Sequence, residues 1–542
     1  MKTITAGQVM REFPLPMMTL ALILVLGAFG CSPAAAPGGG GGGALPDKVI
    51  VGLGDDVPIF SSVRARGGNN RYITTNVYEG LTTTDPEGKV LPGLAVSWKV
   101  SPDGKSYEFK LRKGVTYVNG DPVVAEDVAF VFANSKVPGN AQSLSPEAHW
   151  KSVEILDAET VRYTLTTPDP GFLQTIGSSF QNHLIPQKYY DSVGGEEGFE
   201  KAPVGTGPYK VVDRKIKEGW TLERYEGYWG EKPQIKTAEF RVIPESSTRA
   251  AAMKVGEIDF SANFPPAAME DLEKTGGFKL IKNPANQTIS IRINKLRETD
   301  PATGKPNPFL DKRVRQAMAY SIDRDAIISK VLNGVGEKIA VLFPGDFGYD
   351  PELKPYPYDP NKAKQLLAQA GYPNGFDATF YGLLGERIPL SKEVGEAVAA
   401  YLTAAGIRTK VVPEEYAAWL ARTQRAQSQG KPNELYPMGY GMTYVGGEGT
   451  PWLKWALLSC AHTGHGWNCD PELDKQIDQF KTEGDAKKAE ELAKALARKA
   501  HDEQYIVVLY RSIVVYAMKD RVEFTPTALS AFVELKNLRW TK

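Results

Sequence analysis

Four residues in one short stretch carry side chains that can bind a metal: Cys460, His462, His465 and Cys469. Thiolate sulfur and imidazole nitrogen are usual protein ligands of zinc, so the spacing C-x-H-x2-H-x3-C could form a metal site. The competing interpretation is a disulfide between Cys460 and Cys469, because an oxidised cysteine pair offers no thiolate. We favour the disulfide, with both histidines in a solvated loop, and predict neither a metal site nor a cofactor.

The amino-terminal segment predicts export from the cytoplasm, where disulfides form. Lys2 and Arg11 precede an apolar run from Met17 to Gly30, which is short for a membrane-spanning helix and typical of a signal peptide. The run ends in Ala28-Phe29-Gly30-Cys31, which resembles the cleavage motif of bacterial lipoproteins, although Ala28 and Phe29 depart from its commonest residues. We expect cleavage after residue 30 and lipidation of Cys31. A plain secretory signal with an incidental cysteine is the alternative.

The segment after Cys31 fits a lipid anchor. Residues 32–44 read SPAAAPGGGGGGA and contain nothing that could form a hydrophobic core. Residues 31–45 therefore form a flexible tether in this interpretation. It would hold a soluble protein in the periplasm or at the outer face of the cell membrane.

Composition and motifs argue against two other classes of function. Lys+Arg and Asp+Glu both total 64, so no basic surface for nucleic acid is predicted. The sequence contains no G-x-S-x-G elbow, no P-loop and no H-E-x-x-H motif. We therefore predict a protein that is not an enzyme and has no nucleic-acid partner.

The elements that must position these residues alternate between strands and helices, which predicts an α/β protein. Its 542 residues require more than one hydrophobic core. The predicted strands are Lys48–Leu53, Ser106–Leu111, Ser152–Ile155, Thr160–Leu165, Tyr209–Val212, Thr237–Val242, Thr288–Ile293 and Ile506–Val508. The predicted helices are Val314–Asn333, Pro360–Ala370, Ser391–Ala405, Glu415–Gln429 and Pro471–Glu503, with a turn at Gly484-Asp485 in the last.

Several blocks of sequence resemble the bacterial extracellular solute-binding proteins of family 5, the dipeptide-, oligopeptide- and nickel-binding class. The most specific block reads LPGLAVSWKVSPDGKSYEFKLRKGVTYVNGDPVVAEDVAFVF at Leu91–Phe132. The other blocks follow the family's order and are Asn76–Leu81 (NVYEGL), Pro203–Tyr209 (PVGTGPY), Asp311–Arg324 (DKRVRQAMAYSIDR), Tyr358–Phe376 (YDPNKAKQLLAQAGYPNGF) and Asp470–Ile477 (DPELDKQI). Together they cover nearly all of the chain after the tether.

The resemblance implies a two-lobed periplasmic-binding-protein-like fold of the class II type, with three domains and a hinge between the lobes. Domain I would combine residues 46–82, 201–302 and 511–542. Domain II would be residues 83–200, and domain III residues 303–510. We expect a monomer whose lobes close on the ligand, and the resemblance implies that the permease subunits of an ABC transporter recognise the closed form.

The resemblance also points to a ligand segment. In peptide-binding relatives this segment resembles G-W-x-x-D-Y, and its Asp pairs with the free α-amino group of the peptide. The matching stretch here is Gly439–Tyr444, with Tyr440 and Tyr444 at the aromatic positions and Thr443 in place of the Asp. A buried ammonium needs a counter-charge, which a Thr hydroxyl does not supply. Glu448 lies close enough in sequence to supply it instead.

The aromatic residues allow a second ligand class. Tyr440, Tyr444, Trp452 and Trp455 lie close together, and rings with few charges suit sugars or other neutral solutes. Trp452 and Trp455 could equally be core residues of a helix. Phe60 is a further candidate contact from domain I.

The function that follows is the substrate-binding lipoprotein of an ABC importer, with a di- or oligopeptide as the first ligand class. The ligand contacts that we predict are Tyr440, Thr443, Tyr444, Trp452, Glu448 and Phe60. One alternative is an oligosaccharide or another non-peptide solute. An alternative from a different class is a metal-binding or sensory lipoprotein that works without a transporter.

Overall fold

In the computed structural model of the chain, the residues from Leu45 to Lys542 belong to one unit. The predicted signal peptide, Cys31 and the tether up to residue 44 lie outside the described residues. The described residues are 45–57, 59–62, 70–85, 89–135, 150–169, 171–178, 182–299, 304–342, 347–384, 390–415, 418, 438–444, 459–460, 468–527 and 532–542.

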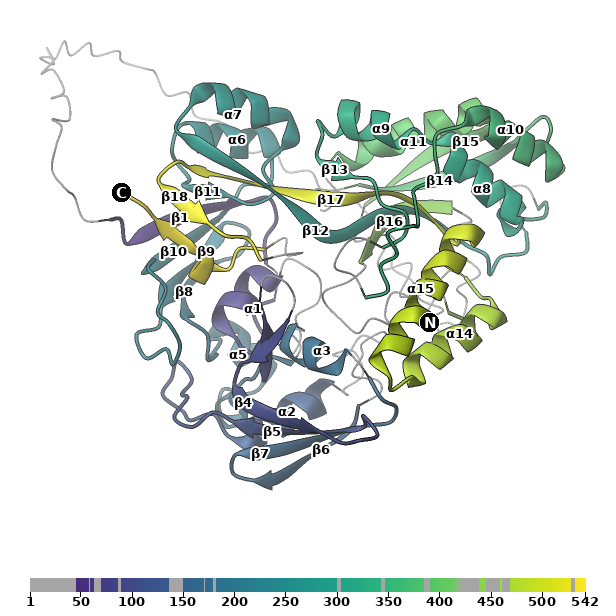
Figure 1. Cartoon of the computed structure of the whole chain (residues 1–542). Helices are drawn as coiled ribbons and strands as arrows, with labels where there is room; N and C mark the ends of the chain where they lie inside the picture. The colour runs from purple at the N-terminus through teal and green to yellow at the C-terminus, as the bar shows by residue number, and fades with distance from the viewer. Residues whose placement is uncertain are drawn as a thin grey trace, which may run out of the picture. The chain divides into compact units, whose positions relative to one another are not determined.

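One mixed sheet of 11 strands is the framework of this unit (Figure 1). Its order is β15-β14-β16-β12-β17-β11-β1-β10-β9-β8, and β13 pairs with β17. The bounds are β1 Lys48–Leu53, β8 Tyr209–Lys215, β9 Gly219–Arg224, β10 Thr237–Val242, β11 Phe260–Ser261, β12 Phe278–Ile293, β13 Gly336–Glu337, β14 Phe376–Leu384, β15 Ile407–Glu415, β16 Met438–Tyr444 and β17 Ile506–Lys519. β17 is buried on both faces, which explains its almost continuous apolar sequence, IVVLYRSIVVYAMK.

A smaller antiparallel sheet has the order β4-β5-β7-β6. Its strands are β4 Ala95–Val100, β5 Ser106–Leu111, β6 Trp150–Asp157 and β7 Thr160–Leu165. In β5 the residues Tyr107, Phe109 and Leu111 are buried, whereas Glu108 between them pairs with Arg162 of β7. This alternation gives the sheet one apolar and one polar face. Two further pairs of strands are β2 Thr82–Thr84 with β3 Val90–Pro92, and β18 Val522–Phe524 with β19 Leu538–Trp540.

The helices pack beside these sheets, with α6 and α7 near one end of the long strands β12 and β17 and α8 to α11 near the other (Figure 1). Their bounds are α1 Arg71–Val77, α2 Ala125–Ser135, α3 Phe172–Ser178, α4 Gln187–Ser192, α5 Glu196–Lys201, α6 Ser246–Lys254, α7 Met269–Thr275, α8 Lys312–Ser321, α9 Arg324–Ala326, α10 Pro360–Gln369, α11 Ser391–Ala405, α14 Pro471–Thr482 and α15 Ala486–Glu503. Shorter turns are the π-helix Ile327–Val331 and the 3₁₀ helices Pro266–Ala268, Pro308–Leu310 and Leu535–Asn537.

The hydrophobic interior is divided into separate cores. The first core contains β1 and the small sheet, and it includes Ala285 of β12 and Tyr516 of β17. The second core lies under α8, α10 and α11, and it includes Ile291 of β12 and Val507 of β17. A third core joins α14 and α15, and a fourth lies between α6, α7 and the sheet. β12 and β17 therefore run from one group of cores to another.

Two arginines of the block Asp311–Arg324 have structural roles. Arg315 is 1% exposed, and its guanidinium donates to the backbone oxygens of Leu310 at 2.8 Å and Glu503 at 2.8 Å. Arg324 is 5% exposed and donates to the backbone oxygens of Ala319 at 2.9 Å and Val508 at 2.8 Å. Each buried cation thus satisfies carbonyl groups from two elements, which ties α8 to α15 and to β17.

Buried polar contacts also explain the block Asn76–Leu81. The Glu79 carboxylate accepts hydrogen bonds from Tyr228 at 2.8 Å and from the Trp229 indole at 2.7 Å. Burial raises the pKa of Glu79 above its ordinary value. These residues hold the fold together and are not candidates for ligand contact.

Most predicted elements are present, but two helix predictions are wrong in part. The predicted helix Val314–Asn333 is split after Ser321, because the Asp323 side chain accepts from the Ala326 amide and begins a new helix. The predicted helix Glu415–Gln429 fails at its first residue, since Glu415 ends β15, and most of the rest lies outside the described residues.

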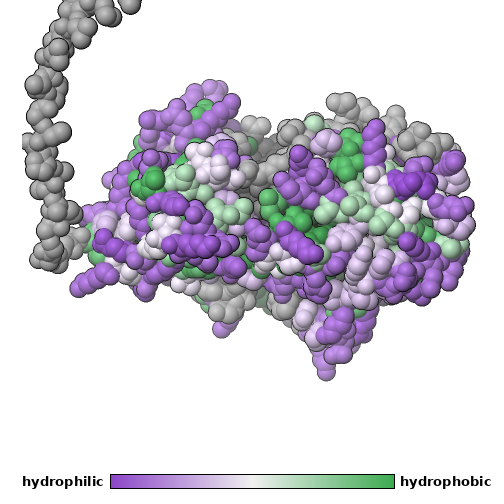
Figure 2. Space-filling model, turned by 90° about the horizontal axis from the view of Figure 1, so that it is seen from above, coloured by the Kyte–Doolittle hydropathy of each residue, from purple (hydrophilic) through white to green (hydrophobic). Residues whose placement is uncertain are grey.

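The surface is mainly hydrophilic on the face in Figure 2, where hydrophobic residues reach the surface only in small separate patches. Within the described part of the chain, no helix has both the length and the apolar character needed to cross a membrane.

Candidate ligand-binding site

The segment with the predicted ligand residues is strand β16, in the interior of the large sheet. β16 pairs in parallel with β14 and antiparallel with β12. In this register Tyr440 lies opposite Ile291, and Thr443 lies opposite Thr288. Directly paired residues share a face of a sheet, and successive residues alternate between its faces. Positions 440 and 443 therefore belong to opposite faces.

The face of the sheet that carries position 443 is polar along β12. Thr288 and Ser290 alternate with Ile289 and Ile291, and the two isoleucines belong to the second core. Thr288 is fully buried, and its hydroxyl has no hydrogen-bond partner among the described residues. A buried hydroxyl without a partner costs about 1–3 kcal/mol, so such groups are usually paired with protein, water or ligand. This hydroxyl makes the neighbourhood of Thr443 the strongest candidate for a ligand contact on this strand.

A second candidate region lies where the parallel strands β1, β10 and β11 end, because ligands of open α/β sheets bind at the carboxyl ends of their strands. Arg249 of α6 organises this edge and is 1% exposed. Its guanidinium donates to the backbone oxygen of Ile243, just after β10, at 2.7 Å, and to that of Asn263, just after β11, at 3.2 Å. One buried cation thus fixes the ends of two strands.

Asn263 is a candidate contact that sequence reasoning missed. It is exposed between the buried residues Ala262 and Phe264, and its φ is 51°, in the left-handed region. Asn tolerates this conformation, and strained backbone of this kind clusters at binding sites. The amide of Asn263 reaches the Tyr72 hydroxyl at 3.4 Å. The only signal in the sequence is an Asn two residues after a short strand, which is too common to single out.

The ionisable group in contact with Asn263 is the Tyr72 phenol. Burial, together with the Asp55 carboxylate, raises the pKa of Tyr72 well above its ordinary value. The Tyr72 phenol therefore stays protonated and can donate or accept a hydrogen bond at neutral pH.

The predicted contact at Phe60 is corrected by the structure. Phe60 is fully buried in the first core, with its ring against Trp220 at a centroid distance of 5.9 Å and the Arg214 guanidinium 4.0 Å from its centroid. Its backbone amide donates to Glu200. Because protein buries the whole side chain, Phe60 has no exposed surface for a ligand.

The structure describes some of the remaining predicted site residues and not others. Trp452 and Glu448 lie outside the described residues, as do His462 and His465, and for Tyr440, Thr443 and Tyr444 only the position in the strand is described. Cys460 and Cys469 form a disulfide. Within the described ranges, no group of three or more His, Cys, Asp or Glu could hold a metal ion.

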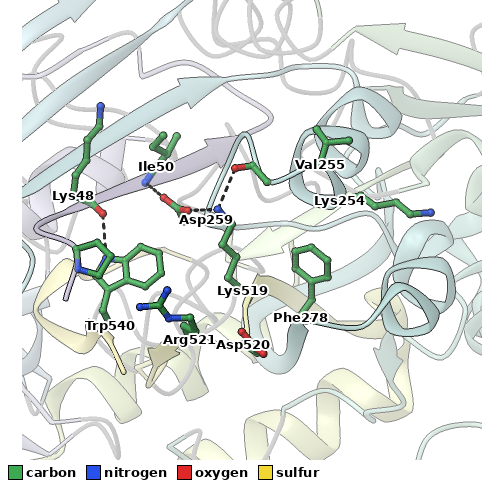
Figure 3. A pocket seen from close by; sticks show the side chains of 13 residues that line it. Lys48, Ile50, Lys254, Val255, Asp259, Phe278, Lys519, Asp520, Arg521 and Trp540 are labelled. Carbon is green, nitrogen blue, oxygen red and sulfur yellow. Dashed lines mark hydrogen bonds and ion pairs between the residues drawn. The ribbon is translucent and has the colours of Figure 1, made fainter. Parts of the chain in front are cut away.

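A surface pocket of about 590 Å³ lies elsewhere, beside the first residues of β1 (Figure 3). Its polar groups pair with one another, because the Lys519 ammonium contacts Asp259 at 2.6 Å and Asp259 accepts from the Ile50 amide at 2.8 Å. The pocket is lined by Lys48 and Ile50, whereas Asn263 follows the opposite end of the neighbouring parallel strand. No residue of β16 lines it, so it is not the predicted ligand site.

Comparison with known proteins decides the family. The model of the bacterial extracellular solute-binding proteins, family 5, matches residues 89–451. The chain belongs to this family. The family 5 protein is 28% identical over 467 residues to the dipeptide-binding protein of Escherichia coli K12, covering 80% of this chain and 83% of the relative.

Solved structures agree with this assignment. The periplasmic binding protein DppA of Helicobacter pylori, in complex with the peptide STSA, matches with a TM-score of 0.77 and 26% identity, covering 91% of this chain and 98% of that one. NikA of Brucella suis, in complex with Fe(III)-EDTA, matches with a TM-score of 0.78 and 25% identity, covering 91% and 100%. The family 5 protein therefore has the two-lobed α/β fold of periplasmic binding proteins, in a family of solute-binding transport proteins that act outside the cytoplasm.

Proposed function

We propose that this protein is the solute-binding lipoprotein of an ABC importer, that it binds a small organic solute between its two lobes, and that it delivers the solute to permease subunits. Cys31 would carry the lipid anchor, and residues 31–45 would form the tether. The protein would act as a monomer in the periplasm or at the outer face of the cell membrane, without catalysis. Domains I, II and III would have the bounds expected from the sequence.

The observation that carries the proposal is the position of Thr443 in the sheet. β16 lies beside β12, and position 443 lies opposite Thr288, whose buried hydroxyl finds no partner in the part of the chain that the structure describes. We infer that ligand binds along this face, which offers hydroxyl groups. The glycines at 439 and 441 share it with Thr443 and leave room for an extended ligand to approach the backbone.

The first ligand class is a di- or oligopeptide, as the names of the Escherichia coli relative and the Helicobacter pylori complex suggest. Glu448 would then supply the counter-charge that Thr443 lacks. The second class is a neutral solute such as an oligosaccharide. One specific feature favours this class: Thr443 stands where the resemblance to peptide-binding relatives implies an Asp.

A thermal-shift screen separates these ligand classes. A solute that binds only the folded state must raise the melting temperature as its concentration rises. Peptides, oligosaccharides and divalent metals are tested against the purified protein, and each hit is then tested on Tyr440→Ala, Thr443→Val and Tyr444→Ala. Gly395→Ala, on a helix of the second core, is the control that should shift like the parent.

The outcomes are distinct. A shift with peptides alone supports the peptide transporter, a shift with sugars alone supports the altered specificity, and a shift with metals alone supports the metal-binding or sensory lipoprotein. Thr443→Val should weaken binding of the hit, because position 443 belongs to the inferred binding face, whereas positions 440 and 444 belong to the other face. Parent-like binding in Thr443→Val, with weaker binding in Tyr440→Ala or Tyr444→Ala, would place the ligand on the other face, and parent-like binding in all three variants would mean that the site is not on β16. The hit is also recovered and checked for chemical change, because turnover would contradict a binding protein.

A further inference from the structure

The strands β12 and β17 pass from the first core to the second, and on each strand the boundary between the two cores falls within a few residues. On β12 it falls between Ala285, in the first core, and Ile289, in the second. On β17 it falls between Tyr510, in the second core, and Val514, in the first. A body of packed side chains moves as a unit, so any rotation between the two cores must be absorbed at this crossing.

The crossing is also where the sheet is irregular. The register between β12 and β17 shifts between Pro284 and Thr288. A bulge of this kind interrupts the ladder, bends the strand and leaves backbone groups in need of other partners. The register shifts again between Ile289 and Ser290, so regular pairing lies before Pro284 and after Ser290, on either side of the irregular stretch.

Arg511 of β17 supplies those partners. It is 5% exposed, and its guanidinium donates through Nε to the backbone oxygen of Ala285 at 2.9 Å and through Nη2 to that of Pro284 at 3.3 Å. Both oxygens belong to the irregular stretch of β12. A guanidinium is planar and holds its donors in a fixed fork, so it also fixes the orientation of the two carbonyl groups.

The same guanidinium reaches a third strand. Its Nη1 lies 3.0 Å from Oε2 of Glu337, which belongs to β13 and is paired with Arg511 in the ladder. The neighbours of Glu337 pack in different places: Val335 belongs to the fourth core, whereas Ile339 packs against Val508, which lies between Val507 and Leu509 of the second core. Three strands that cross between the cores thus meet at one side chain.

We propose that Arg511 is a positioning residue at the hinge of this protein, and that its contacts to β12 and β13 set the equilibrium between arrangements of the two lobes. The inference rests on the proposed function only in requiring that the lobes move. Without the guanidinium, the irregular stretch has no fixed geometry, and the two lobes sample a wider range of angles. Ligand capture would then carry a larger ordering cost.

The test measures lobe movement without any ligand, so it does not depend on identifying one. Fluorophores are attached through genetically encoded unnatural amino acids at the exposed residues Glu231 and Lys364, on opposite sides of the crossing. Single-molecule energy transfer then gives the distribution of distances in the parent protein, Arg511→Met and Glu337→Gln. The matched control is Arg539→Met, which removes an arginine paired with Glu523 away from the crossing.

Arg511→Met should broaden the distribution and change the ratio of its populations by about tenfold, the effect of losing one charge-assisted interaction. Glu337→Gln should broaden the distribution in the same way but to a smaller extent. This variant tests the proposal if Arg511→Met does not fold. Arg539→Met should leave the distribution unchanged. A parent-like distribution in folded Arg511→Met, or in Glu337→Gln if Arg511→Met is unfolded, would overturn the proposal. A later failure to find a ligand would count against the proposed function alone.

Discussion

Thr443 on β16 lies directly opposite Thr288 on β12, and the Thr288 side chain is fully buried. This pairing puts two hydroxyl residues side by side, and the family resemblance of the segment Gly439–Tyr444 implies an Asp at position 443 in proteins that bind peptides. Restoring the carboxylate is therefore a direct test of ligand class.

Thr443→Asp should tighten binding of peptides with a free amino terminus by about tenfold or more, since an ammonium gains a counter-charge. Thr443→Asn, similar in shape but neutral, is the control and should give no such gain. The measurement is calorimetric titration with one peptide and its N-acetylated form. Equal affinity of Thr443→Asp for the two forms would show that position 443 does not face the amino group.

We predict that Gly205, in the block Pro203–Tyr209, cannot be replaced by a larger residue without steric conflict. A Cβ on Gly205 would lie 2.0 Å from the backbone oxygen of Val77 and 2.7 Å from the Tyr78 ring. Gly205→Ala should lower the free energy of unfolding by about 2–3 kcal/mol or more, because backbone must move. In Gly395→Ala, on helix α11, no described atom lies within 4 Å of the new Cβ. That control should be neutral or stabilising by up to about 1 kcal/mol in denaturant titrations. Equal effects of the two substitutions would refute the steric explanation.

The disulfide between Cys460 and Cys469 is predicted to stabilise the protein. It closes a loop that ends directly before Asp470, the residue that caps α14. Loop-closure entropy for a ring of this size is about 2–3 kcal/mol. The double substitution Cys460→Ser and Cys469→Ser should lower unfolding free energy by about that amount, and reductant should then have no further effect. A variant as stable as the parent under oxidising conditions would contradict this role.

His183 predicts loss of stability in mild acid. Burial and the nearby Arg71 guanidinium lower the pKa of His183 to about 3. The unfolded chain binds this proton near pH 6.5 and the folded chain does not, so unfolding becomes easier as the pH falls below about 6.5. Between pH 6.5 and 5 the contribution is about 2 kcal/mol.

The effect is isolated by comparing the parent with His183→Gln in urea titrations at several pH values. The variant should be less stable at pH 7.5, and its stability should fall less steeply with acid. Parallel pH profiles for the two proteins would mean that His183 is not the group responsible.

The family and the outline of the fold were predictable because they depend on local pattern. Arg315 and Arg324 of the block Asp311–Arg324 have a structural role, because each satisfies carbonyl groups of elements distant in sequence. The short runs at 288–293 and 506–508 were recognised as strands, but each is part of a much longer strand. Their extensions contain charged and polar residues such as Arg511, whose partners are far away in sequence.

The candidate site was less predictable. Strand alternation separates Tyr440 from Thr443, and only the register with β12 shows that position 443 lies on the polar face. Phe60 looked like a free aromatic residue, although Trp220 and Arg214, more than a hundred residues later, cover its ring. Asn263 carries no distinguishing motif, and only its φ and its exposure mark it.

The central claim is that this family 5 protein binds a small solute reversibly and does not transform it. Isothermal calorimetric titration of the purified protein with the strongest hit of the thermal-shift screen tests it most directly. The account predicts saturable binding of one solute molecule per chain, weakened in Thr443→Val, with the solute recovered unchanged. Heat from continuing turnover, or no saturable binding of any peptide, oligosaccharide or metal, would contradict it.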